Sequence, residues 1–503
     1  MPRHHRMALG LGSGATLLSL LGSWIPSLWG DEAASAMSAE RPLGSLFTML
    51  THVDAVHGTY YFGLHFWVAL FGSSPFVLRL PSAIAVGFVV SAVYLLCRRL
   101  SNERIALAAA IICAVLPRTT YMGEEARSFA FSAAIAAWST LVLIMLIQQR
   151  NHQRSLWIIY GILIAVGTYV FLYVALFVVV HLAILLSSRS AVAADPKFFH
   201  HWFVSAGAGL VASAPIIVLA IGERGQISYL AGQPQFGFTT LTESLWFGDA
   251  LFATLAWSIL ILGLVLLVVQ YVMSTSRSPR QNGEPLDATV MLPRLEIVGL
   301  AWLLIPAAAL ITFSLVDPIF TARYLSFCAP AAAILVALAL HRITAGGAIF
   351  MVVAVALVVA VAAPVYLSQR EPYSKNNSDW AEISAALAAE ARPGDVVVFD
   401  ESASPSHRPR LAMHTYPAGF VGLRDVTIKT PFPRSDTWYD RTYSIGVALA
   451  RGRFDNVTVV WLIEYVPLGQ VDTYGLAPLH AAGFQIVSQQ AEHSSVIYKL
   501  VRP

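Results

Sequence analysis

The sequence of residues 7–33 reads MALGLGSGATLLSLLGSWIPSLWGDEA, an apolar stretch that runs into the acidic pair Asp31 and Glu32. About 20 apolar residues suffice to cross a bilayer as a helix, so a spanning helix is expected over residues 7–28. Carboxylates at the edge of a membrane are costly to place, and by default they indicate a site of chemistry or transport. The stretch therefore predicts a membrane fold and marks the first candidate for a functional site.

The composition of the whole chain also predicts a membrane protein. Of its 503 residues, 57% are hydrophobic and only 12% are charged, whereas soluble chains carry roughly twice that charged fraction. The net charge of +3 is too small to indicate nucleic-acid binding. Cys97, Cys113 and Cys328 lie in apolar stretches without paired spacing, so neither a disulfide framework nor a metal knuckle is expected.

The length rule predicts about eleven spanning helices. The expected ranges are 7–28, 78–97, 104–118, 128–147, 155–170, 172–188, 202–222, 248–273, 295–316, 322–340 and 346–367. Residues 3–6 (RHHR) before the first helix resemble a signal peptide, but no small-residue cleavage site follows, so an uncleaved signal-anchor is expected. Residues 274–294 are expected to form a flexible linker.

Basic residues predict the orientation. A cytoplasmic N-terminus places thirteen of them in cytoplasmic segments: Arg3, Arg6, Arg98, Arg99, Arg104, Arg150, Arg154, Arg189, Lys197, Arg277, Arg280, Arg294 and Arg342. The short outer segments between the spans then hold only six: Arg41, Arg79, Arg118, Arg127, Arg224 and Arg323. This excess follows the positive-inside rule and places the acidic clusters on the outer side of the membrane.

Two segments outside the spans are expected to be ordered. Residues 29–78 form a long first outer loop, in which Tyr60–Phe71 is apolar and aromatic but short for a span, so it is interpreted as an interfacial helix. Residues 370–503 alternate between helix and strand signals, with buried strands over 396–400, 457–463 and 495–501, which predicts a small extracytoplasmic α/β domain. The expected domains are thus 1–369, a transmembrane domain, and 370–503, the α/β domain.

Asp31 and Glu32 have two readings. They could cap the next helix, whose first backbone N–H groups stabilise a carboxylate. Alternatively, Asp31 is a general base at the membrane surface and Glu32 orients it or holds a cation. The functional reading is favoured because of the cost of charge at this depth.

Asp54 and His57 lie three residues apart, so they share one face if this segment is helical. They form either a hydrogen-bonded pair in a polar loop or a substrate clamp. A divalent cation could be held by Asp31, Glu32 and Asp54, but oxygen-only sites have little sequence signature, so no cofactor is assigned.

Two arginines on the expected outer side suit an anionic headgroup. Arg127 follows Glu125, and Arg323 precedes Tyr324 at the start of a later span. The planar guanidinium fork matches phosphate oxygens, although an arginine at a helix start can also be an interfacial anchor. Tyr173 could line the same site or belong to an aromatic belt.

The order of these motifs resembles the GT-C superfamily of membrane glycosyltransferases, in particular protein O-mannosyltransferases and lipid A aminoarabinose transferases. The resemblance covers about the first 340 residues and is carried by residues 30–33 (GDEA), 54–61 (DAVHGTYY), 70–72 (LFG), 79–82 (RLPS), 125–129 (EARSF) and 323–325 (RYL). Each motif is weak alone, and the ordered set is fairly specific.

The resemblance implies an α-helical polytopic GT-C fold and an inverting transferase that uses a polyprenyl-phosphate sugar. By this analogy Asp31 deprotonates the acceptor hydroxyl, and Arg127 or Arg323 stabilises the leaving phosphate. Mannose is the first candidate sugar, and the acceptor is a cell-envelope glycan, a glycolipid or a protein. The family usually has His-Pro-Pro after its second Asp, whereas this chain reads Val56-His57-Gly58-Thr59, which puts the carried-over role of His57 in doubt.

Two alternatives compete with a transferase. A transporter or flippase of a polyprenyl-linked sugar would place charges on broken helices at mid-membrane and show two matching halves. The sequence shows neither, because its charges cluster near one interface. A non-catalytic cell-envelope scaffold would tolerate the loss of Asp31.

Overall fold

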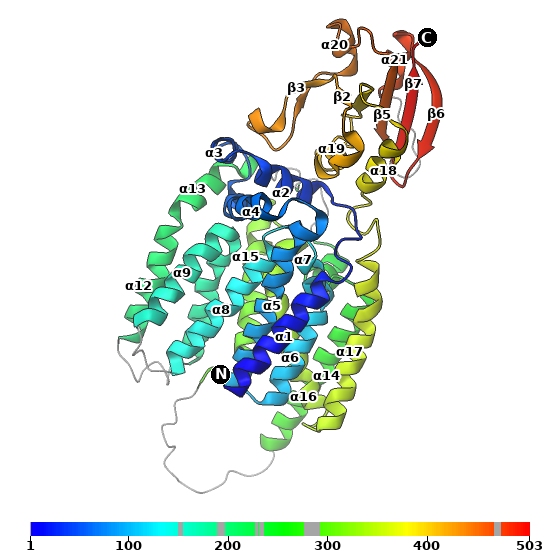
Figure 1. The fold of residues 1–503 in the computed structure, drawn as a ribbon. Helices are drawn as coiled ribbons and strands as arrows, with labels where there is room; N and C mark the ends of the chain where they lie inside the picture. The colour runs from blue at the N-terminus through cyan, green and yellow to red at the C-terminus, as the bar shows by residue number, and fades with distance from the viewer. Residues whose placement is uncertain are drawn as a thin grey trace. The chain divides into compact units, whose positions relative to one another are not determined.

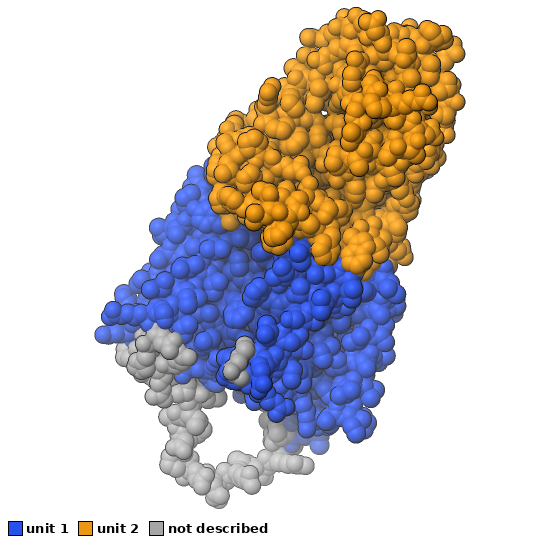
Figure 2. Space-filling model, in the orientation of Figure 1, with its two compact units in different colours: residues 1–21, 80–367 blue, residues 22–79, 368–503 orange. Residues whose placement is uncertain are grey.

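The computed structural model describes residues 2–148, 154–188, 197–226, 230, 236–275, 292–466 and 474–503. The chain divides into two compact units (Figure 2). The helical unit comprises Met1–Leu21 and Leu80–Leu367, and the sheet-bearing unit comprises Gly22–Arg79 and Ser368–Pro503. Residues 29–78, which were expected to form the first outer loop, therefore group with the C-terminal part of the chain. The expected domain boundary at residue 369 stays a prediction.

The helical unit is a bundle of apolar helices (Figure 1). They are α1 (Arg3–Leu20), α5 (Pro75–Leu100), α6 (Glu103–Val115), α7 (Pro117–Gly123), α8 (Phe129–Gln148), α9 (Arg154–Val170), α10 (Phe177–Ser187), α12 (Phe198–Ala212), α13 (Ala214–Gly222), α14 (Ala250–Thr275), α15 (Leu295–Ser314), α16 (Ala329–Ile343) and α17 (Ala348–Ser368). The 3₁₀ turns η2 (Leu172–Leu176) and η5 (Ala322–Cys328) precede α10 and α16, and a π turn, η4 (Thr240–Ser244), precedes α14.

Helical segments occur at every range that the length rule predicted, so the polytopic fold is confirmed. Six helices of the described residues are long and apolar enough to cross a membrane, or eight if each bent pair is one span. The count of eleven stays a prediction. The expected linker over 274–294 lies mostly outside the described residues.

Proline breaks one predicted span. The range 104–118 is not a single helix, because α6 ends at Val115 and α7 begins at Pro117, with a bend of 58° between them. Leu116 has an extended backbone (ψ 127°), as expected for a residue that precedes proline. The bend places Arg118 in a short second helix.

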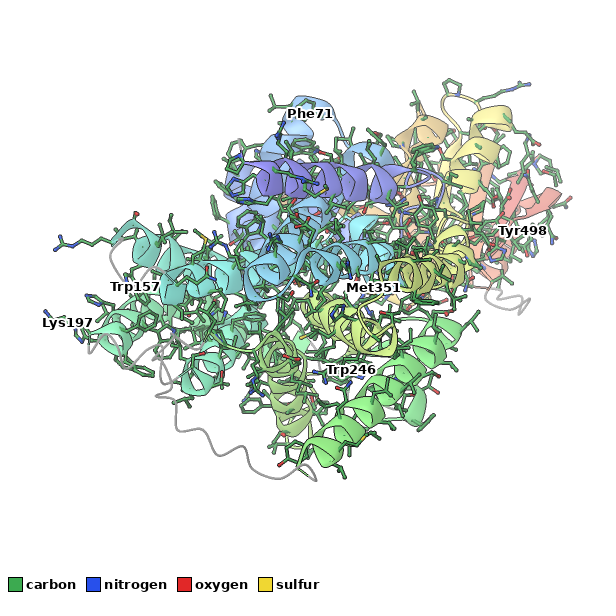
Figure 3. All side chains as sticks on the ribbon, turned by 90° about the horizontal axis from the view of Figure 1, so that it is seen from below. Phe71, Trp157, Lys197, Trp246, Met351 and Tyr498 are labelled. Carbon is green, nitrogen blue, oxygen red and sulfur yellow. The ribbon has the colours of Figure 1, made fainter. Side chains whose placement is uncertain are left out.

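The core of the helical unit depends on close helix contacts. A Cβ atom on Gly12 of α1 would lie 2.7 Å from the carbonyl oxygen of Gly87 on α5, so only glycine permits this crossing. Met351 of α17 and Trp157 of α9, labelled in Figure 3, are two buried core residues far apart in sequence. His181 is fully buried between Tyr160, whose hydroxyl lies 2.8 Å from Nδ1, and Thr140.

The sheet-bearing unit contains both helices and strands. Its helices are α2 (Gly30–Glu40), α3 (Leu43–Leu50), α4 (Gly58–Phe71), α18 (Trp380–Glu390), α19 (Leu411–Thr415), α20 (Ile445–Ala450) and α21 (Leu476–Ala481). Its 3₁₀ turns are η1 (Ala55–His57), η6 (Pro405–His407), η7 (Pro417–Phe420) and η8 (Phe432–Arg434). Residues 60–71, expected as a short helix, lie within α4.

The strands form two sheets. They are β1 (Val396–Phe399), β2 (Arg424–Asp425), β3 (Ile428–Thr430), β4 (Arg441–Thr442), β5 (Val459–Tyr465), β6 (Gln485–Ala491) and β7 (Ser495–Val501). The larger sheet has the order β2-β1-β5-β7-β6, parallel through β1 and antiparallel at β7, with Val398 opposite Leu462. β3 and β4 form a separate antiparallel pair. The predicted C-terminal α/β domain is confirmed.

The interior of this unit includes residues from both of its segments. The α18 face of Trp380, Ile383 and Leu387 packs against β1, and Ala33 and Met37 of α2 belong to the same buried cluster. β1 is buried along its whole length, as expected for a strand between two parallel neighbours. The packing fixes α2, and with it the acidic pair, on this unit.

Candidate active site

The acidic pair lies in the first turn of α2. A glycine is required at the start of this helix, because a Cβ atom on Gly30 would lie 2.5 Å from the Cβ atom of Ser406. Asp31 is half-buried and Glu32 is fully buried. The partial positive charge at a helix N-terminus stabilises carboxylates in this turn.

Glu32 forms a bidentate ion pair with Arg79. Arg79 Nε donates to Glu32 Oε1 at 2.7 Å, and Arg79 Nη2 donates to Oε2 at 2.5 Å. The remaining donors of Arg79 bond the backbone, with Nη1 donating to the carbonyl oxygens of Ser23 and Pro26 at 2.5 and 2.9 Å. Both side chains are inaccessible to solvent. This pair ties α2 to the chain segment that precedes it and to the start of α5.

The neighbouring carboxylates therefore differ. Both oxygens of Glu32 are engaged by one arginine, which suits a residue that fixes the start of α2. Asp31 is the half-buried member of the pair, and its position one residue earlier in the same turn is set by that ion pair. The geometry favours Asp31 over Glu32 as a proton acceptor, and the roles of both stay a prediction.

Asp54 has an unusual backbone and several partners. It adopts the left-handed region (φ 61°, ψ 30°), which is uncommon outside glycine and occurs most readily for Asp and Asn. The hydroxyl of Tyr61 donates to Oδ2, and Trp438 Nε1 donates to the same oxygen at 3.1 Å. His57 Nε2 lies 4.0 Å from Oδ1. The structure thus brings Asp54 and His57 together, as the spacing predicted, and both are buried.

Trp438 is held in place by Arg41. The fully buried Arg41 donates from Nη1 to the carbonyl oxygen of Ser435 at 2.8 Å and from Nη2 to that of Trp438 at 3.1 Å. It also donates to the carbonyl oxygen of Thr437, and its guanidinium lies 5.5 Å from the Phe432 ring centroid. Residues of the C-terminal segment therefore form part of the surroundings of Asp54.

The helical unit holds the remaining predicted site residues. Glu124, Glu125 and Arg127 lie in the turn between α7 and α8 and are buried, with exposed fractions of 0%, 2% and 8%. The backbone N–H of Arg127 donates to the carbonyl oxygen of Glu125 at 2.8 Å. Ser82 of α5 donates to the carbonyl oxygen of Arg127 at 3.3 Å, so this turn is fixed from two sides.

Arg118 joins this group, although it was not predicted as a site residue. It lies within electrostatic range of the Glu125 carboxylate and of the Arg323 guanidinium. Its Nε atom is buried and has no hydrogen-bond partner among the described residues. We refer to Arg118, Glu125, Arg127 and Arg323 as the arginine cluster. An available sequence signal was an arginine at the outer end of the predicted span 104–118, on the same expected side as the acidic clusters.

Two tyrosines lie beside the arginine cluster. The rings of Tyr173 in η2 and Tyr324 in η5 have centroids 5.7 Å apart. The Tyr173 hydroxyl donates to the carbonyl oxygen of Ile319 at 3.2 Å. Arg323, Tyr324 and Tyr173 are thus connected through neighbouring 3₁₀ turns, where backbone irregularity interrupts the helices.

The geometry does not support a cation site at the three acids. Within the described ranges, no group of three His, Cys, Asp or Glu side chains could hold a metal ion. Asp31, Glu32 and Asp54 therefore do not form such a group, and Arg79 engages both oxygens of Glu32. The region of the arginine cluster instead holds three arginines, Arg118, Arg127 and Arg323, against two glutamates, Glu124 and Glu125, and arginine side chains suit an anionic ligand.

Comparison with known proteins connects these residues to one family. Residues 59–218 match the family model described as "Dolichyl-phosphate-mannose-protein mannosyltransferase". This range contains Arg79, Arg118, Glu125, Arg127 and Tyr173. No curated protein matches the chain in sequence.

Solved structures share the fold along most of the chain. ArnT from Cupriavidus metallidurans in the apo state has a TM-score of 0.58 at 14% identity, covering 97% of both chains. The same protein bound to undecaprenyl phosphate gives 0.54, also at 14% identity and 97% of both chains. The Archaeoglobus fulgidus oligosaccharyltransferase tethered with an acceptor peptide gives 0.50 at 12% identity, covering 98% of this chain and 74% of that one. The chain thus has the GT-C fold of these solved structures, and over residues 59–218 it is similar to the mannosyltransferase family.

Proposed function

We propose that this protein is an inverting glycosyltransferase that moves a sugar from a polyprenyl-phosphate donor to an acceptor hydroxyl at the outer face of a bacterial plasma membrane. The observation that carries the proposal is the family match over residues 59–218, because it spans most of the arginine cluster. A structure of the same fold bound to undecaprenyl phosphate supports a polyprenyl-phosphate donor. Mannose is the first sugar to test, since the matched family is described by a mannose donor.

In this reaction Asp31 is the general base. Its carboxylate takes the proton of the acceptor hydroxyl, whose oxygen attacks the anomeric carbon of the donor sugar. The base must reach the hydroxyl within about 3 Å, and such proton transfer contributes roughly 10²–10⁴-fold to the rate. Glu32, bound to Arg79, fixes the first turn of α2 and so orients Asp31. Inversion follows because the attack and the departure of the phosphate occur on opposite faces of the sugar.

The arginine cluster stabilises the leaving phosphate. As the bond between the anomeric carbon and the phosphate oxygen breaks, negative charge develops on the lipid phosphate. Preorganised cations in a site of low polarity stabilise such charge most effectively. Arg127 and Arg323 fit this role, and Arg118 adds a third guanidinium, which lies within electrostatic range of Arg323. Tyr173 and Tyr324 line the cluster.

Asp54 and His57 are proposed to bind substrate. Asp54 is constrained by Tyr61 and Trp438, and constraint of this kind gives a polar group one fixed direction. The acceptor, a glycan, a glycolipid or a protein, is then oriented by the sheet-bearing unit, which supplies all of these residues.

The test is sugar transfer by purified protein in bilayers from radiolabelled polyprenyl-phosphate mannose. Asp31→Asn is expected to lower the transfer rate by roughly 10²–10⁴-fold, because the amide cannot accept the proton. Asp317→Asn is the matched control, since Asp317 is an exposed aspartate of the helical unit outside the proposed machinery. Its rate should equal that of wild type.

Other outcomes would show which part of the proposal is wrong. If Asp31→Asn and wild type transfer sugar equally, Asp31 is structural and the base assignment is wrong. If wild type transfers none of the mannose, arabinose, aminoarabinose and glucose donors, the transferase proposal is contradicted in favour of a flippase or a scaffold. Flipping of a labelled polyprenyl lipid in the same vesicles separates these two.

A further inference from the structure

A groove in the helical unit involves none of the residues of the candidate active site. It has a volume of about 570 Å³ and is lined mainly by α1 and α6. This volume falls within the roughly 300–1,000 Å³ typical of small-molecule sites. Because its lining runs from Arg3 to Leu18, it extends along about 22 Å of α1, at about 1.5 Å per residue. One leaflet contributes half of a hydrocarbon core of about 30 Å, or about 15 Å. The groove is therefore long enough for the acyl chain of a lipid.

The groove is open because its lining side chains are small. Gly10 and Gly14 of α1 lie one helical turn apart, and a Cβ atom on either would meet no atom within 4 Å. Ala110 and Ala114 repeat this spacing on α6. The opposite side of α1 is tightly packed, since Gly12 crosses Gly87 of α5 at backbone distance. The sequence of α1 therefore places close packing on one face and a cleft on the other.

The mouth of the groove is basic. Arg3 and Arg6 line it, are exposed, and lie three residues apart on α1, so they share one face. Neither forms an ion pair with any residue that the structure describes. Arg3 lies within electrostatic range of the Tyr94 hydroxyl, and that hydroxyl and Arg98 Nε bond the two oxygens of Glu103, at 2.6 and 2.7 Å. The nearby acid is thus occupied by other partners.

We propose that this groove binds an anionic phospholipid, with one acyl chain along Gly10 and Gly14 and its phosphate between Arg3 and Arg6. Apolar walls suit a hydrocarbon chain, and two cations at one end select a negatively charged headgroup over a zwitterionic one. An arginine near a membrane surface contributes roughly a fivefold gain in affinity for anionic lipid. The site is independent of the proposed transferase reaction and involves none of its residues.

The test uses full-length protein purified in neutral detergent and equilibrated with phosphatidylglycerol or phosphatidylcholine of identical chains. Bound lipid is counted by native mass spectrometry. Wild type is expected to hold one phosphatidylglycerol in preference to phosphatidylcholine. Gly10→Leu/Gly14→Leu fills the groove and should lose that lipid, and since leucine favours a helix more than glycine, α1 should still form. Arg3→Gln/Arg6→Gln should weaken binding on the order of 25-fold.

Matched controls test whether the loss of lipid is specific to the groove and to the two arginines at its mouth. Gly207→Leu introduces the same side chain at another helical glycine with no atom within 4 Å of its Cβ position, and Arg154→Gln removes another exposed arginine at a helix start. Both should bind lipid as wild type does. The proposal is overturned if the groove-filled variant retains phosphatidylglycerol, if wild type binds both lipids equally, or if the controls lose it to the same extent. Sugar transfer enters none of these measurements, so failure of the transferase proposal leaves this one standing.

Discussion

The ion pair of Glu32 and Arg79 in the sheet-bearing unit and the arginine cluster in the helical unit hold charge in different ways. In the first, one carboxylate meets one guanidinium with two short hydrogen bonds, and the charges cancel. In the second, Arg118 lies near one carboxylate and a second arginine, and its Nε atom has no hydrogen-bond partner among the described residues. A matched buried pair suits a structural role, whereas an excess of arginines in a partly buried cluster is what an anionic ligand would need.

The largest expected effect comes from breaking the matched pair. Glu32→Gln leaves Arg79 buried without a counter-charge, and such changes cost roughly 3–5 kcal/mol of unfolding free energy. The midpoint of thermal unfolding in detergent should fall accordingly. The exposed pair of Arg98 and Glu103, with side chains 47% and 44% exposed, provides the contrast. Arg98→Gln should change stability by about 0–1 kcal/mol.

A double variant tests whether the instability of Glu32→Gln comes from the unpaired buried charge of Arg79. Glu32→Leu/Arg79→Met removes both charges and keeps apolar volume, so it should be more stable than Glu32→Gln alone, because no buried charge is left unpaired. If the double variant is no more stable than the single one, the orientation of α2 depends on the hydrogen bonds of Arg79 to the backbone of residues 23–27 instead.

The next largest effect is expected from removing one guanidinium of the arginine cluster. Arg118→Gln should lower the rate of sugar transfer by roughly 10²–10³-fold, the usual loss when one preorganised donor to developing charge is removed. Stability should change little, since no hydrogen bond of the Nε atom is lost. The measurement is single-turnover transfer with saturating donor, alongside thermal unfolding.

Arg224→Gln is the matched control, because Arg224 is an exposed arginine of the same unit outside the cluster. Arg118→Lys keeps the charge without the planar fork and should restore part of the rate. Unchanged transfer in Arg118→Gln would assign that arginine to packing of α7 and leave the phosphate to Arg127 and Arg323.

Elements with a local apolar pattern could be predicted from the sequence, and an element that depends on a partner could not. Apolar length predicted the helices, and the last strand, expected over 495–501, has the bounds that the structure has. The neighbouring strand β6 was missed, because its residues Gln485–Ala491 are exposed throughout and carry no apolar periodicity. An edge strand is stabilised by pairing with its neighbour, here β7, and the sequence of the edge strand itself gives little sign of that pairing.

Partners far apart in sequence were also beyond prediction. Arg79 was read as part of a motif, but its bond to Glu32 spans 47 residues. Trp438 meets Asp54 across 384 residues, and no local pattern indicates such a contact. Arg118 was placed at the outer end of a straight span, whereas the break at Pro117 puts it in the short helix α7, which leads into the turn that holds Glu125 and Arg127. Residue types thus indicated the chemistry, whereas the constraint on each side chain came from tertiary structure.

The smallest expected effect is on the constraint of Asp54. Trp438→Phe keeps an aromatic ring and removes the indole N–H that donates to Oδ2 at 3.1 Å. A hydrogen bond to a charged group contributes roughly 1.5–3 kcal/mol, but Tyr61 still donates to the same oxygen. We therefore expect a loss of about 1 kcal/mol, or roughly fivefold in kcat/KM for the acceptor.

Trp461→Phe is the matched control, because Trp461 Nε1 donates in the same way to Asp395 Oδ2, at 2.9 Å, elsewhere in the sheet-bearing unit. A similar loss of stability in both variants, with a loss of kcat/KM only in Trp438→Phe, would show that the C-terminal segment orients a substrate-binding carboxylate. Equal kinetics in the two variants would contradict that role, and Asp54 would then be grouped with Glu32 as a residue whose partners serve structure alone. Of Asp31, Glu32 and Asp54 in the sheet-bearing unit, only Asp31 would then keep a proposed role in the reaction.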